Sequence, residues 1–141
     1  MPKAHSQKLT HRYVVHYPAH EPREGDPHYV DFHAYREKTK AAARCAIGAH
    51  RDDFSECDDS HPIELHHARI EFALQNSVDL KWLEVDYPGV SDPDKVGAWV
   101  ESAQNLQWLC QFHHRGVGGV HRLDASNYEA EKYIRHLVTE E

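Results

Sequence analysis

Four histidines fall in two short segments of the sequence, each of which also carries one other polar side chain of catalytic type. The first segment is Glu64-Leu65-His66-His67, and the second runs from Asn105 to His113-His114. Imidazole can act as a base near neutral pH, and in its neutral form it binds metal ions. The composition of the two segments therefore indicates one site, split between them, that needs both a base and metal ligands.

Apolar residues alternate with these polar ones and would bury the framework that holds them. We expect one strand over 63–67 and a second over 106–109. Neighbouring residues of a regular strand point to opposite faces. His66 and His67 can therefore serve one site only if the first strand ends or bulges there.

The remaining sequence favours helices around and between these strands. Residues 12–17 have strand composition, and residues 51–61 are a polar, acidic loop. Helices are expected from Asp31, as its N-cap, to about Gly48, over 68–83, after Asp92-Pro93, and over 126–139. In the last of these, Ser126 to Glu129 reads as a capping box. Its buried stripe would be Ala130, Tyr133, Ile134, Leu137 and Val138.

The order of the polar residues resembles the HNH endonucleases of the ββα-metal class. A His doublet is followed by Asn105 and, nine positions later (114 − 105), by His114. Glu-Leu-His-His is similar to the start of this motif in colicin-type DNases. Asn-Leu-x-x-Leu-Cys-x-x-His-His resembles the usual Asn-Leu-x-x-Leu-Cys-x-x-Cys-His, and residues 113–121 are similar to small stand-alone phage HNH proteins.

This resemblance implies an α+β fold in a single domain, residues 1–141. A ββα-metal (HNH) core would span 62–121, with extra flanking helices that include the C-terminal helix 126–139. The 38 residues from His67 to Asn105 (105 − 67) exceed the compact form of the motif. Residues 70–103 are therefore expected to form a helical insertion between the two motif strands, and residues 1–30 an N-terminal extension that is partly mobile.

The resemblance also implies an activity, a metal-dependent endonuclease that hydrolyses DNA phosphodiester bonds. His67 would be the general base, and His66 and His114 would bind a divalent ion. Asn105 would hydrogen-bond the loop that carries His67, although in other branches of the class this position binds the metal directly.

Three further residues are candidates at the same site. Many relatives carry a ligand four residues after the position of His114, but here that residue is Gly118, so His121 is the candidate third ligand. Because glycines at 116, 118 and 119 break a helix, His121 must reach the metal on a loop. Glu64 would orient a ligand histidine or hold Arg115, and Arg115 would contact the scissile phosphate.

The ligand types leave the metals open. Imidazole suits zinc, nickel or manganese, whereas magnesium prefers oxygen ligands, so Mg, Mn, Ni and Zn are all candidates for the catalytic site. HNH proteins often carry a structural zinc as well. Here Cys45, Cys110 and His113 would bind it with either His50 or Cys57. In the other interpretation the cysteines are buried small apolar residues.

The net charge of −7 argues against a protein that binds DNA through its bulk charge. Lys and Arg gather instead in residues 1–20, which contain no acid, and in 35–44. DNA is the expected partner, and the phage resemblance suggests a DNA-packaging terminase as a second one, with the oligomeric state left open. Three cysteines, with no secretory signal and no membrane-spanning run, favour the cytoplasm, the host's if the protein is phage-encoded.

Two other functions fit the sequence. One is a catalytically silent HNH-fold module that binds nucleic acid or protein, as an accessory to phage DNA packaging. The acidic balance favours it, whereas the intact set of site residues favours the nuclease. The other is a metallohydrolase of some other substrate, for which no His-Glu-x-x-His or deaminase signature is present.

Overall fold

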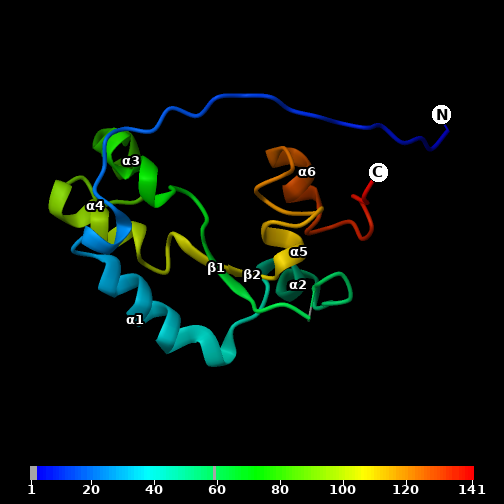
Figure 1. Cartoon of the computed structure of the whole chain (residues 1–141), viewed down its shortest axis with the longest axis horizontal. Coiled ribbons are helices and arrows are strands. Elements are labelled where there is room, and N and C mark those ends of the chain that lie inside the picture. Colours follow the sequence, from blue (N-terminus) through cyan, green and yellow to red (C-terminus); the bar gives the residue numbers. More distant parts are fainter. Residues whose placement is uncertain (1–2, 59) are drawn as a thin grey trace.

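A two-stranded antiparallel sheet lies between two groups of helices in the computed structural model, which describes residues 3–58 and 60–141 (Figure 1). Its strands are β1 (Glu64–His67) and β2 (Leu106–Leu109). The fold is therefore α+β, as expected. The helices are α1 (Tyr29–Thr39), α2 (Ala46–Arg51), α3 (Leu80–Asp86), α4 (Pro93–Val100), α5 (Gln111–His114) and α6 (Ala125–Ala130), with shorter 3-10 turns η1 (Arg23–Gly25), η2 (Lys40–Ala42) and η3 (Phe72–Ser77).

The two strands pair along their whole length, with Glu64 opposite Leu109 and His67 opposite Leu106. The buried side chains of Leu106 and Leu109 anchor β2 in the interior. β1 ends at His67, and the next backbone amide, that of Ala68, donates to the carbonyl of Asn105 at 2.6 Å. Both strand predictions are thus confirmed, and the first strand ends at the histidine doublet.

Two small apolar cores flank the sheet. One packs Ile47 of α2 against Leu109, together with Cys45 and Cys110. The other joins α4 to the segments before it, around Trp99. It consists of Val90, Trp99 and Val100, with Ile70, Leu83 and Tyr87 against them. The sheet therefore connects a core that contains cysteines with a core built from the segment between the strands.

The segment between the strands is helical, but it is not the single helix expected over 68–83. η3 ends at Ser77, and Asp79 then caps a new helix, because its carboxylate accepts from the amide of Lys81. The predicted start at Asp92-Pro93 is confirmed, since the Asp92 side chain caps α4 and Pro93 is its first residue. Among the described residues, no helix is long and apolar enough to cross a membrane.

Predictions at the N-terminal side need correction. Residues 12–17 form no strand; they are extended and exposed, with no sheet partner among the described residues. Helix α1 starts at Tyr29, so Asp31 lies in its first turn and pairs with His28 instead of capping the helix. Gly48 lies inside α2 and does not end a helix. A side chain at this position would clash with the ring of Phe54, so the glycine permits close packing there.

The predicted C-terminal helix 126–139 is also wrong. Helix α6 covers only Ala125–Ala130, and its cap is Asp124, whose carboxylate accepts from the amide of Asn127. Ser126 therefore lies within the helix rather than at its cap. Beyond α6 the chain forms turns and coil, and three members of the expected buried stripe are exposed: Tyr133, Ile134 and Leu137. Amphipathic spacing alone did not make this segment helical. Arg51 of α2 donates hydrogen bonds to the backbone carbonyls of Glu131 and Ile134, which a continuing helix would use for its own bonds.

Candidate active site and metal centres

Three histidines come together where β1, α5 and the glycine-rich turn after α5 meet. His66, His114 and His121 each offer a ring nitrogen, and these nitrogens lie within 4.8 Å of one another. The Nε2 atoms of His114 and His121 are 3.0 Å apart. His66 is buried whereas His121 is exposed, so the cluster is open on one side. Three protein ligands with an open position are the arrangement that catalytic zinc sites use.

The carboxylate of Glu64 orients one of these rings. Nδ1 of His114 lies 3.3 Å from Oε1 of Glu64, so the opposite nitrogen, Nε2, faces His121. Such a carboxylate fixes the ring orientation and tautomer of a metal-binding histidine. Arg115 also pairs with Glu64, through both its Nε and its terminal nitrogen. The sequence analysis offered two alternatives for Glu64, a contact with a ligand histidine or one with Arg115, and the structure shows both contacts.

Burial keeps the central histidine of the cluster uncharged. The pKa of His66 is lowered to about 3, first by burial and then by the neighbouring rings of His114 and His121. The pKa of His114 is also lowered, again mainly by burial, with Glu64 opposing the shift. A neutral imidazole is the form that binds a metal ion, so both residues are in the ligand state at neutral pH.

His67 faces away from this cluster. Its Nε2 lies 3.1 Å from both carboxylate oxygens of Glu101, the residue that follows α4. The ring of Phe32 stacks on its face, and Arg23 lies 3.6 Å from the same carboxylate. The side chains of His67 and Glu101 are both buried, at 7% and 2% exposure. Although β1 ends at His67, the ring of His67 does not point toward the three-histidine cluster.

The side chain of Asn105 ties down the loop that follows His67. Its Oδ1 accepts from the amides of Arg69 and Ile70 at 3.0 and 2.9 Å. Its Nδ2 donates to the carbonyls of Ile70 and Val100. Asn105 is fully buried and lies outside the three-histidine cluster. This geometry agrees with a loop-holding residue rather than a metal ligand.

A second cluster contains three cysteines and one histidine. Cys45, Cys57, Cys110 and His113 place their ligand atoms within 4.8 Å of one another. Nδ1 of His113 lies 3.2 Å from the sulfur of Cys110 and 3.6 Å from that of Cys45. His50, the alternative to Cys57, instead packs its ring edge-on against Tyr133. The structure therefore places Cys57 in the group.

The donors of this group fit zinc. Three sulfurs and one imidazole are a common set for structural zinc, and the ligating thiols must be deprotonated. The hydrogen bond between Cys45 and Cys110 is the largest cause of a lowered pKa for Cys45 and of a raised pKa for Cys110, so one thiol of this pair ionises far more readily than the other. Within the described residues, Nε2 of His113 and Oε2 of Glu131 are buried without a hydrogen-bond partner. His113 also lowers the pKa of Glu131 electrostatically, against the larger effect of burial, which raises it to about 7.

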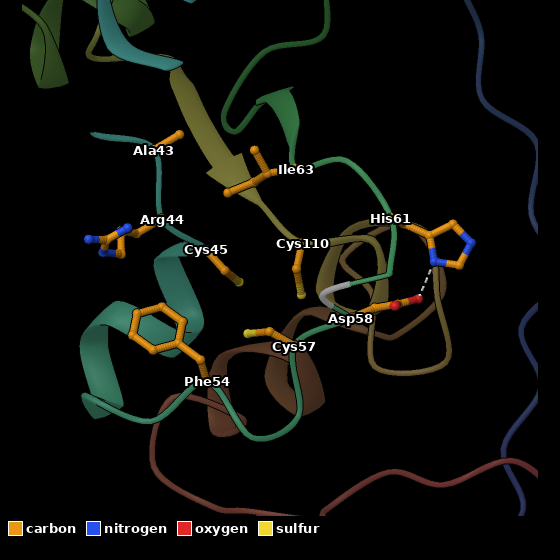
Figure 2. Close-up of a pocket in the computed structure, with 9 residues that line it drawn as sticks. All are labelled: Ala43, Arg44, Cys45, Phe54, Cys57, Asp58, His61, Ile63 and Cys110. Carbon is orange, nitrogen blue, oxygen red and sulfur yellow. Dashed lines mark hydrogen bonds and ion pairs between the residues drawn. The ribbon is translucent and has the colours of Figure 1, made fainter. Parts of the chain in front are cut away.

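A cavity of about 460 Å³ opens onto the sulfurs of the cysteines. Figure 2 shows Cys45, Cys57 and Cys110 converging at its floor, with Phe54 and Ile63 beside them. An ion in solution can reach the ligands through this opening, as a metal site requires. The buried Cys₃His cluster can thus hold a metal such as zinc.

Comparisons of the chain with models of protein families, with curated proteins and with solved structures found no match.

Sequence reasoning missed Glu101, Arg23 and Phe32, the residues that surround His67. A single acidic residue just after an amphipathic helix carries no local signal of burial. Glu101 comes to His67 from 34 residues away, because the helical segment between the strands folds back onto β1.

Proposed function

We propose that the chain is a metal-dependent endonuclease that hydrolyses DNA phosphodiester bonds. The observation that supports this most is the open cluster of His66, His114 and His121 at a strand–strand–helix junction, with His67 next to it in the sequence. This set combines neutral imidazole ligands with an open side for a substrate oxygen. The candidate base His67 follows His66 in the chain, although its ring faces Glu101 and not the cluster. The resemblance to HNH endonucleases supports the same reaction.

Each residue of the site has a role in this proposal. His67 takes the proton from the attacking water, with Nδ1 as the reacting nitrogen because Nε2 is held by Glu101. Asn105 keeps the loop after His67 in place through its four hydrogen bonds. Arg115 neutralises a phosphate oxygen once substrate draws it from Glu64, a move that its 61% exposed side chain permits.

A divalent ion held by His66, His114 and His121 would supply Lewis-acid stabilisation of the phosphate and of the leaving oxygen. The zinc-type Cys₃His group would be structural, because four protein ligands leave no open position.

Plasmid cleavage tests the proposal. Wild type and His67→Ala are incubated with supercoiled DNA in Mg, Mn, Ni or Zn, with an EDTA control. We expect nicked or linear product from wild type. For His67→Ala we expect the cleavage rate to fall about 10²–10⁴-fold while the melting temperature stays unchanged. His61→Ala is the matched control, since His61 is half-exposed and, among the described residues, pairs with its sequence neighbours Asp58 and Ser60. An unimpaired His67→Ala enzyme would contradict the role of this residue.

A second candidate is a catalytically silent module that binds nucleic acid or protein. The burial of His67 between Phe32 and Glu101 favours it, because a base must reach its water. The same plasmid experiment separates the two: absence of any product from wild type, in every metal, would leave the binding module.

A further inference from the structure

The first segment of the chain is an extended arm that differs in charge from the rest of the protein. Residues 1–20 contain Lys3, Lys8, Arg12 and four histidines but no Asp or Glu, although the whole chain carries a charge of −7. Residues 3–17 are exposed and form neither helix nor strand. Two tyrosines of this arm are exposed, Tyr13 at 77% and Tyr17 at 56%. Cationic and aromatic side chains on an open backbone are the elements of single-stranded nucleic-acid binding.

Weak contacts hold the arm across the face of the molecule that carries α6 (Figure 1). His11 lies 3.5 Å from Asp124, the cap of α6, and Lys8 pairs with Glu141 at 2.7 Å. Both pairs are solvent-exposed or partly so, and such pairs contribute only about 0–1 kcal/mol. The phosphates of a nucleic acid can therefore compete for these cations with Asp124 and Glu141.

The arm forms one wall of a cavity of about 530 Å³ whose other wall includes His121. Tyr13 and Arg122 also line this cavity. Because His121 belongs to the three-histidine cluster, the cavity lies directly beside the proposed reaction site. Its volume is in the range of small-molecule sites, so it can hold one nucleotide.

We propose that the arm and the cavity bind a single strand of nucleic acid next to the three-histidine cluster, an inference that rests on the proposed function. A base stacks on the ring of Tyr13, while Lys8, Arg12 and Arg122 contact the flanking phosphates. The strand is unpaired, because a base stacked inside a duplex offers no free face to a tyrosine ring. The arm therefore selects DNA that is already opened or frayed at the cleavage point.

Fluorescence anisotropy with a labelled oligothymidine strand, in buffer without added divalent ions, tests this inference. We expect Tyr13→Ala to weaken binding about 5- to 150-fold, the effect of one lost stacked base. In the double variant Lys8→Gln/Arg12→Gln, the salt dependence should fall by about 1.4 in slope, or ~0.7 for each lost phosphate contact. The matched controls are Tyr133→Ala, an exposed tyrosine outside the arm, and Lys81→Gln/Lys95→Gln, two exposed lysines elsewhere.

The inference is overturned if the arm variants bind as their controls do, or if duplex of the same length binds more tightly than the single strand. The outcome is separate from that of the plasmid experiment. Binding that depends on Tyr13, in a protein that never cleaves DNA, would remove the nuclease and keep the arm as a binding element. Cleavage by wild type, with arm variants that bind DNA as wild type does, would support the nuclease and remove the binding role of the arm.

Discussion

Glu101 holds one nitrogen of His67 and leaves the other free. Two carboxylate oxygens lie 3.1 Å from Nε2, and the stacked ring of Phe32 limits rotation of the imidazole. A carboxylate in this position keeps the proton on Nε2 and stabilises the charged ring that forms when Nδ1 takes a second proton. Arg23, 3.6 Å away, offsets the charge of the buried carboxylate. Glu101 is therefore a positioning residue in the proposed reaction.

The change Glu101→Gln tests this position. The amide can donate to the imidazole as well as accept from it, so the ring is no longer held with Nδ1 free. We expect the turnover rate of plasmid nicking at saturating DNA to fall at least ~10-fold, with KM unchanged. Glu101→Asp should recover part of the rate.

The melting temperature of each variant shows whether the fold has changed. Glu129→Gln is the matched control, because Glu129 is exposed and, within the described part of the chain, its carboxylate pairs with Lys132 alone. Normal turnover in Glu101→Gln would contradict the positioning role, whereas a rise in KM together with a fall in melting temperature would indicate a structural role.

The sequence pointed to several site residues because their partners lie within the same two segments. The resemblance to HNH endonucleases implied His66 and His114 as ligands and His121 as the candidate third, and the structure brings these three histidines together. Glu101 could not be found in this way, because its contact with His67 depends on how the helical segment between the strands packs. Cys57 could not be separated from His50, since either donor completes the same ligand set.

At the scale of elements, one glutamate joins α3 to the turn before α4. The carboxylate of Glu84 accepts from the backbone amides of Gly89, Val90 and Ser91 at 2.7, 3.0 and 2.9 Å. Gly89 has a φ of +97°, in the region that favours glycine, so the turn can present these amides to one carboxylate. The pKa of Glu84 is lowered by these bonds, chiefly by the one from Gly89.

This turn should make stability depend on pH. Because the folded pKa of Glu84 lies below its ordinary value of 4.5, its contribution is fully present above that value and is lost as the pH falls through the folded pKa. We expect Glu84→Gln to lower the urea midpoint at pH 7, and to lower it less at an acidic pH below 4.5. Other carboxylates titrate in both proteins, so the difference between the two midpoints is the quantity to follow. A difference that is the same at both pH values would contradict the prediction.

Element prediction succeeded where a cap or a strand pattern was supported by packing. Asp92-Pro93 started α4, and the two motif strands paired as expected. It failed at the C-terminus, where the helix stops at Ala130 and Arg51 of α2 hydrogen-bonds the backbone carbonyls of Glu131 and Ile134. It failed at residues 12–17 for another reason, since strand composition forms a strand only where a neighbour supplies hydrogen bonds.

At the scale of the whole molecule, the Cys₃His group connects three separate parts of the chain. Cys45 precedes α2, Cys57 lies in the loop before β1, and Cys110 and His113 belong to the start of α5. The core around them is small, and the group lies within it. In a small core, a metal ion that binds only the folded state adds directly to its stability.

Loss of one ligand should therefore reduce both zinc content and stability. Loss of a group that only hydrogen-bonds a metal ligand weakens metal binding about 10–100-fold. Because Cys57→Ser replaces a ligand itself, we expect it to weaken zinc binding by more than this and to lower the melting temperature. His50→Ala is the control that should retain one equivalent of zinc in native mass spectrometry. Full zinc occupancy in Cys57→Ser, or zinc loss in His50→Ala, would contradict the ligand set that the structure supports.

His113 and His114 are consecutive residues of α5, yet their rings belong to different clusters. One short helix thus carries a candidate ligand of each cluster, so fixing either ring would restrict the other. In the proposed function, in which both clusters bind ions, the two binding equilibria would be coupled through the order of that helix. Such coupling is reciprocal. If zinc at the cysteines changed the affinity of the histidine site by some factor, an ion at the histidines would change the zinc affinity of the cysteine site by the same factor.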